Sequence, residues 1–146
     1  MNGRPMNDDT GSTLPLIIGY AMLALVVVLL ATAATSLYIE RKRLFTLADG
    51  AALVGAESFE LTAVSMTPHG PRPLLDDAEV ADSVAGYLAT VPETGFEGLA
   101  VHGAHTVDGL SATVTLGAFW RPPVLTLFVP EGLPIEVTAV ARSVFD

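Results

Sequence analysis

The sequence contains no cysteine and few basic residues. Without cysteine the chain has neither disulfide bonds nor thiol chemistry, so the redox compartment is not indicated. Seven Lys and Arg stand against sixteen Asp and Glu, for a net charge of -9. Nucleic-acid binding needs clustered positive charge, so this balance argues against a nucleic-acid partner.

Residues suited to catalysis are also scarce. Of the three histidines, His102 and His105 are three apart on an expected strand, which predicts opposite faces and no shared metal ion. Asp76 and Asp77 are interpreted as a helix cap. The sequence has no nucleophile elbow and no phosphate-binding glycine loop. We therefore predict a protein that is not an enzyme and has no cofactor, metal site or small-molecule substrate.

The most prominent feature is a long uncharged run, from Leu14 to Leu37. About 20 apolar residues cross a hydrocarbon core roughly 30 Å thick. Pro15 falls in the first turn of such a helix, where its missing amide proton costs nothing. This run predicts a single membrane-spanning helix over residues 12–38, after a leader or tail at 1–11.

A cleavable secretion signal is the alternative for the same run. Ala31-Thr32-Ala33 offers a small-residue cleavage pattern, and cleavage near Ala33 would release a small secreted binding domain. Signal peptides begin with positive charge, whereas this N-terminus has one base, Arg4, and two acids, Asp8 and Asp9.

Helical periodicity continues past the apolar run. Apolar residues recur at spacings of three to five up to about Phe59, so residues 39–66 are assigned to an extension of the first helix. The bases Arg41, Lys42 and Arg43 are expected to contact lipid headgroups at the membrane interface. Small residues permit close helix packing; the candidates are Ala31, Ala33, Ala34, Ala51 and Ala52.

Residues 67–146 predict a small α+β domain. A proline-rich loop over 67–73 precedes a second helix, which begins at Asp76 with Glu79 as its capping-box partner. Val80 and Val84 belong to its apolar stripe, and Pro92 ends it.

Alternating residues then predict a three-stranded antiparallel sheet. A two-residue turn at Asp108-Gly109 would join the first two strands, with Val101 opposite Leu116, Gly103 opposite Val114 and His102 opposite Thr115. The third strand is expected at 135–144. The apolar stretch before it, at 121–134, is interpreted as a hydrophobic lobe or a short extra strand. Trp120 is interpreted as a core or edge aromatic residue, with a contact surface as the alternative.

Two stretches resemble a known family. "GSTLPLIIG" at 11–19 and "ERKRLFTLADGAALVGAESF" at 40–59 are similar to the pilin-like TadE and TadG-like proteins of the Tad system, found beside Flp pilus genes. The resemblance implies a pilin-like fold and a minor pilin or accessory subunit in Flp pilus assembly or an associated secretion process. It implies the lipid bilayer and other pilin-like or Tad-system membrane subunits as partners.

The resemblance also bears on processing and orientation. Pilin-type precursors are cut after a glycine, which implies possible cleavage between Gly11 and Ser12. The Glu that such pilins carry at the fifth mature position is Leu16 here, which favours an uncleaved anchor or an accessory role. The basic residues after the run favour a cytoplasmic C-terminal domain. The resemblance instead implies a cell-membrane protein with an extracytoplasmic C-terminal domain, and we adopt this orientation as the expectation.

Overall fold

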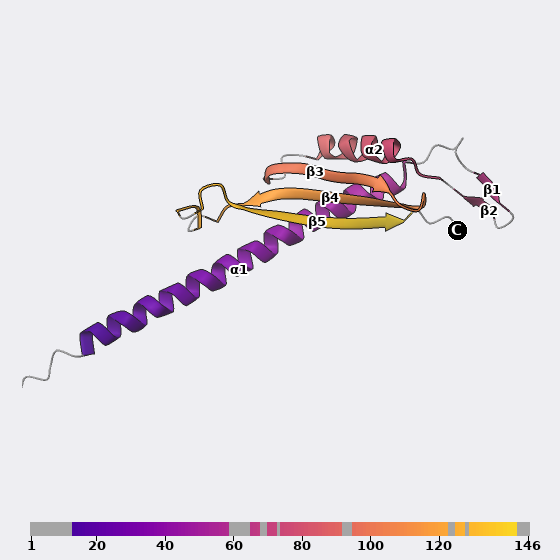
Figure 1. The fold of residues 1–146 in the computed structure, drawn as a ribbon. Coiled ribbons are helices and arrows are strands. Elements are labelled where there is room, and N and C mark those ends of the chain that lie inside the picture. The colour runs from indigo at the N-terminus through magenta and orange to yellow at the C-terminus, as the bar shows by residue number, and fades with distance from the viewer. Residues whose placement is uncertain are drawn as a thin grey trace, which may run out of the picture. The chain divides into compact units, whose positions relative to one another are not determined.

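A computed structural model describes residues 13–58, 65–67, 70–72, 74–91, 95–122, 125–127 and 129–142. The chain divides into two compact units, Met1–Ser36 and Leu37–Asp146, and each is described by itself. The fold is α+β: a long apolar helix, a second helix and a three-stranded antiparallel sheet, as the sequence predicts (Figure 1). The elements are α1 (Thr13–Ala56), β1 (Ser65–Thr67), β2 (Gly70–Arg72), α2 (Asp77–Thr90), β3 (Glu97–Thr106), β4 (Ser111–Trp120), a 3-10 helix (Leu125–Leu127) and β5 (Leu133–Arg142).

The helix α1 is 44 residues long, or roughly 66 Å at 1.5 Å per residue. Its last turn closes where the amide of Glu57 donates to the carbonyl of Leu53 and the hydroxyl of Ser58 donates to the carbonyl of Gly55. The helix therefore ends at Ala56, before the expected limit of residue 66. Residues 65–67 are already a strand, and Phe59 lies outside the described residues.

The core of the second unit lies between the end of α1 and the sheet. The buried α1 residues follow the i, i+3, i+4 spacing of one helix face. At Gly55 this face of α1 packs closely against both the sheet and α2. A Cβ added there would lie 3.2 Å from both Ala112 of β4 and Val80 of α2. The core comprises Leu44, Leu47, Ala48, Ala51, Ala52 and Ala56 of α1, Val80 and Val84 of α2, and Ala112, Val114, Leu116, Ala118, Trp120, Ile135, Val137 and Ala139 of the sheet.

The helix α2 begins with the predicted cap. The carboxylate of Asp76 accepts a hydrogen bond from the amide of Ala78 at 2.8 Å. The second arm of the predicted capping box is not made by Oε2 of Glu79, which is buried without a hydrogen-bond partner among the described residues. Asp77 joins α2 to the sheet, because its carboxylate accepts from the amide of Thr106 at 2.8 Å. Pro92 lies outside the described residues.

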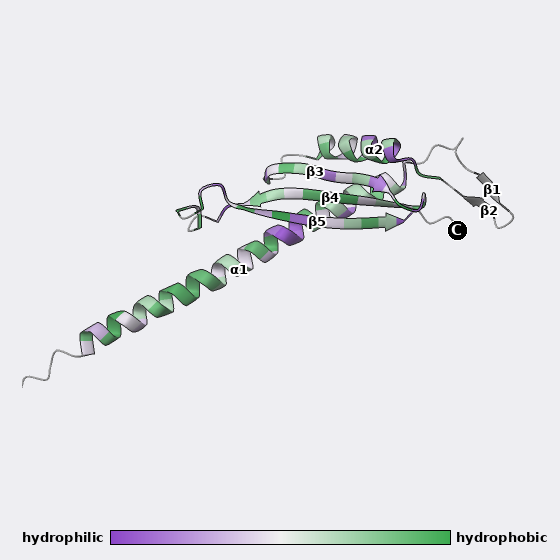
Figure 2. Ribbon diagram, in the orientation of Figure 1, coloured by the Kyte–Doolittle hydropathy of each residue, from purple (hydrophilic) through white to green (hydrophobic). Residues whose placement is uncertain are grey.

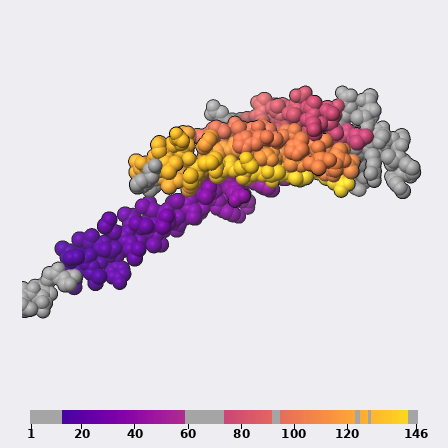
Figure 3. All heavy atoms as spheres, in the orientation of Figure 1, coloured from indigo at the N-terminus to yellow at the C-terminus, as the bar shows by residue number. Residues whose placement is uncertain are grey.

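The sheet has the strand order β3-β4-β5, all antiparallel. Alternate residues of β4 and β5 are buried, which confirms the predicted period of two. Trp120 is 7% exposed, so it is a core residue. The side chains of β3, β4 and β5 form one continuous surface, and α2 lies along its β3 side (Figure 3).

The predicted register of the first hairpin is only partly right. Val101 lies opposite Leu116 as predicted, but Gly103 lies opposite Thr115 and not Val114. The connection is one residue longer than a two-residue turn, since Thr106 lies opposite Ala112. A β-bulge between Val101 and Gly103 inserts one residue in β3 and restores the expected pairing beyond it.

A second bulge lies between Glu97 and Ala100. It contains Gly98, whose φ of +61° lies in the left-handed region that glycine adopts readily. A Cβ at this position would also lie 2.8 Å from the ring of Phe119.

The proline-rich segment and the apolar stretch at 121–134 both contain short regular elements. Part of the proline-rich segment pairs as β1 and β2, with Met66 opposite Pro71. Proline is compatible with such a strand because a two-stranded ribbon has outer edges that need no amide donor. In the apolar stretch at 121–134, residues 125–127 form a 3-10 helix in place of a short extra strand, and Leu127 is 80% exposed.

We expect opposite effects from filling two helical glycines. Gly55→Val adds atoms against Ala112, Val80 and Val84, so it should lower the free energy of unfolding by about 1 to 3 kcal/mol. Gly86→Ala on α2 meets no atom within 4 Å and should raise it by up to about 1 kcal/mol. The measurement is urea unfolding of the full chain in detergent, followed by Trp120 fluorescence. Equal stability of the two variants would contradict this packing.

Candidate functional site

The first half of α1 has no core of its own. Its most apolar stretch of 18 residues has a mean hydropathy of 2.7, and no residue of that stretch is buried. Leu14, Tyr20 and Leu30 expose 66%, 66% and 65% of their surface. Figure 2 shows this half as an almost unbroken hydrophobic helix that ends where the charged residues 40–43 begin. By length and composition this is a helix that can cross a membrane.

Two hydroxyl groups on this half are satisfied within the helix. Thr32 donates to the carbonyl of Val28 at 2.8 Å, and Thr35 donates to the carbonyl of Ala31 at 2.9 Å. Such bonds reduce the cost of burying a hydroxyl in hydrocarbon, where water cannot replace the partner. These threonines are therefore compatible with a lipid environment.

The five predicted helix-packing alanines fall into two groups. Ala31 and Ala34 are exposed and Ala33 is half-buried in the first unit, where they remain available to another helix. Ala51 and Ala52 are fully buried in the second unit. Those two alanines pack within their own domain.

The three predicted interface bases differ in their surroundings. The guanidinium of Arg43 lies 3.4 Å from the carboxylate of Glu40 and 5.5 Å from the centre of the Phe96 ring. Arg41 and Lys42 are exposed and line a groove between α1 and β5. The cluster therefore contains one base held against the domain and two that face an open groove.

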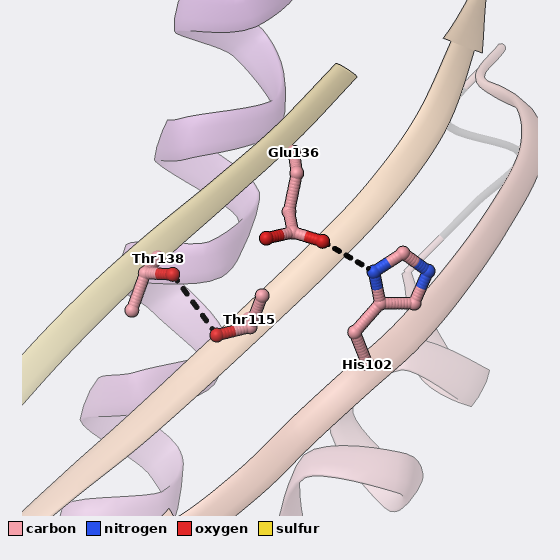
Figure 4. Close-up of polar contacts among 4 residues, drawn as sticks. All are labelled: His102, Thr115, Glu136 and Thr138. Carbon is pink, nitrogen blue, oxygen red and sulfur yellow. Dashed lines mark hydrogen bonds and ion pairs between the residues drawn. The ribbon is translucent and has the colours of Figure 1, made fainter. Parts of the chain in front are cut away.

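Four polar side chains lie together on the outer face of the sheet (Figure 4). Nδ1 of His102 lies 2.7 Å from Oε2 of Glu136, and the hydroxyls of Thr115 and Thr138 are 2.9 Å apart. His102 covers Gly117, where an added Cβ would lie 2.5 Å from its Cε1 atom. Both His102 and Glu136 are at least half exposed, so this pair is a surface interaction.

The predicted opposite placement of His102 and His105 is wrong. His105 lies opposite Thr113, and Thr113 shares the outer face with Thr115. The bulge at His102 inserts one residue, which changes the alternation and brings both histidines to this face. No group of three His, Cys, Asp or Glu residues suited to a metal ion occurs within the part of the chain that the structure describes.

Comparison with protein-family models identifies the segment that contains α1. Residues 11–58 match the Tad family, described as "Putative Flp pilus-assembly TadE/G-like". The chain carries a TadE/G-like domain at its N-terminus. No curated protein and no solved structure matches the chain.

The TadE/G-like domain coincides with α1. It covers about a third of the chain and includes both the exposed apolar half of α1 and the half that is buried against the sheet. The second helix and the strands lie beyond the match. The family assignment therefore rests on the helix and its surface pattern.

The predicted processing positions lie at the start of the TadE/G-like domain. Gly11 and Ser12 lie outside the described residues, so cleavage between them stays a prediction. Leu16, which would be the fifth residue after such a cleavage, is on α1 and 60% exposed.

Beyond the TadE/G-like domain, the turn between β3 and β4 depends on Asp108. Its carboxylate accepts hydrogen bonds from the amides of Leu110 and Ser111 and from the hydroxyl of Ser111. The bonds from the Leu110 and Ser111 amides hold the pKa of Asp108 below its usual value, because they stabilise the charged form. The turn is therefore most stable with Asp108 ionised.

We expect Asp108→Ala to lower the thermal midpoint of the domain at neutral pH. A depressed folded-state pKa adds stability above the unfolded-state pKa, and that stability is lost as the pH falls through the folded-state value. The gap between wild type and Asp108→Ala should therefore close as the pH falls from about 6 to about 2. Asp108→Asn is the control, because it keeps an acceptor and should lose less. Thermal melts by Trp120 fluorescence measure these gaps, and a gap that widens in acid would contradict the assignment.

Proposed function

We propose that this protein is a non-catalytic, minor pilin-like subunit of Flp pilus assembly or of an associated secretion process, anchored by one N-terminal membrane helix. The observation that carries this proposal is the change of surroundings along α1. Its first half is apolar and unburied, whereas its second half buries one face in the domain. An element of this kind fixes a folded domain to a bilayer.

The energetics favour insertion of the first half. Eleven Leu, Ile and Val residues lie between Leu14 and Leu30. At about -0.3 to -0.6 kcal/mol each near the bilayer centre, they contribute roughly -3 to -7 kcal/mol. A water-soluble chain would instead expose this whole surface, far more than the patches tolerated on soluble proteins.

Assembly with other membrane subunits gives the exposed alanines a role. Without a hydrophobic drive between helices in lipid, association depends on close packing at small residues. Ala31 and Ala34 are spaced i, i+3 on one face and are exposed on α1. We propose this face as the contact with other pilin-like or Tad-system subunits.

We propose that the domain formed by residues 67–146 and the end of α1 lies outside the cytoplasm. The resemblance to pilin-like TadE and TadG-like proteins supports this orientation, because it implies a C-terminal domain outside the cytoplasm. Arg41, Lys42 and Arg43 favour the opposite orientation by the rule that basic residues stay inside. Orientation is therefore the first property to measure.

The absence of cysteine makes the orientation directly measurable. Val107→Cys introduces one thiol at a side chain that is 82% exposed in the β3–β4 connection. In intact cells a membrane-impermeant maleimide should label Val107→Cys and leave Asn2→Cys unlabelled until the cells are lysed. The reverse pattern would assign the domain to the cytoplasm. A soluble Val107→Cys chain that begins near Ala34 would instead identify the secreted binding domain.

The assembly role predicts that bulk at the alanine face disrupts partner binding. The Ala31→Leu/Ala34→Leu variant should recover about tenfold less of the copurifying Tad-system membrane subunits than wild type, corresponding to ~1.4 kcal/mol. Ala21→Leu makes the same chemical change elsewhere on the apolar half and is the matched control. Quantitative mass spectrometry of the purified complexes provides the measurement. Equal losses for both variants would argue against a specific packing face.

A further inference from the structure

A groove between α1 and β5 opens at the start of the second unit. Tyr38, Arg41, Lys42 and Phe45 line it from α1, and Val137 and Thr138 line it from β5. The four α1 positions are spaced i, i+3, i+4 and i+7, so they share one face of the helix. The groove has a volume of about 360 Å³, within the range of small-molecule sites.

The groove combines positive charge with apolar walls. Two of its six residues are bases and none is acidic, in a chain whose net charge is -9. The nearby acid Glu40 lies against Arg43 at 3.4 Å, and Arg43 also faces Phe96. The positive charge of Arg41 and Lys42 is therefore not neutralised by any other residue that lines the groove.

The position of the groove in the chain indicates which anion it meets. Tyr38 follows the apolar half of α1 directly, so the groove begins where that half ends. In a bilayer this is the level of the phosphate groups, where tyrosine and basic side chains are favoured. Phe45 and Val137 add apolar surface suited to the glycerol and upper acyl carbons of a lipid.

We propose that this groove binds the headgroup of an anionic phospholipid, with Arg41 and Lys42 on its phosphate. This inference rests on the proposed membrane anchoring of α1. It assigns lipid binding to Arg41 and Lys42 and not to the third base of the cluster, Arg43. Arg43 is excluded because its guanidinium is held by Glu40 and Phe96. The bound lipid fixes the depth of the domain at the membrane surface.

The test is native mass spectrometry of the full chain in detergent, titrated with phosphatidylglycerol or phosphatidylcholine. Wild type should bind phosphatidylglycerol more tightly than phosphatidylcholine. Arg41→Gln and Lys42→Gln should each weaken phosphatidylglycerol binding about fivefold, the effect of one base near an anionic surface. Lys42→Arg should retain it, because the charge and the phosphate contact remain.

Two matched controls separate a built site from general surface charge. Arg43→Gln removes the same charge beside the groove, and Arg142→Gln removes it at the end of β5; each should change binding less than twofold. An Arg43→Gln loss equal to that of Arg41→Gln would overturn the proposal. Every variant must keep the Trp120 emission of the folded domain, and a Gln variant that does not is replaced by the Ala variant at the same position, which also removes the charge.

The remaining outcomes identify other ligands. Displacement of phosphatidylglycerol by millimolar inorganic phosphate would make this a free-phosphate site and overturn the lipid assignment. Binding of a second copy of this chain in place of lipid would overturn it as well. Failure of membrane anchoring is a separate result, because it appears as a chain absent from the membrane fraction of cells, whatever the purified chain binds.

Discussion

The large exposed apolar surface on one half of a single helix is the constraint on which the rest of the molecule depends. None of residues 13–36 is fully buried, and Thr32 and Thr35 bond to the backbone of their own helix. Without lipid or partner helices this surface has no favourable surroundings. The remainder of the molecule can stay small, because the same helix that carries this apolar surface also supplies one wall of the domain's core.

The two halves of α1 differ in pattern more than in composition. The first half is apolar on all sides, which suits a helix surrounded by lipid. The second half is apolar on one face, where small residues let the helix approach the sheet closely at Gly55 and Ala112. The bases at 41–43 mark the change between them. One continuous helix therefore carries two different surface patterns, and the charged turn separates them.

The sequence was sufficient to predict the elements that have a clear local signal. Uniform hydrophobicity predicted the long apolar helix, Asp76 predicted the start of α2, and alternation predicted all three strands. The sequence did not predict features that depend on contacts distant in the chain. The bulge at His102 is one of them, and it places His102 and His105 on the same face of the sheet, where the sequence predicted opposite faces.

The candidate site shows the same limit. The sequence identified Arg41, Lys42 and Arg43 as one cluster, because they are consecutive and equally charged. Only folding brings Phe96 to Arg43 and strand β5 to the other two. The sequence likewise did not distinguish among the five candidate packing alanines, whereas the fold buries Ala51 and Ala52 in the domain core. In each case the contacting residue lies many positions away in the sequence, so a local sequence pattern does not predict the contact.

The paired irregularities of the β3–β4 hairpin have an evolutionary consequence. The connection after Thr106 is one residue longer than a two-residue turn, and the bulge at His102 offsets it by one residue in the same strand. Because each irregularity contains its own extra residue, a one-residue deletion at either place would leave the strand pairs on both sides of it unchanged. Related chains can therefore gain or lose the two irregularities independently, each as a single-residue insertion or deletion.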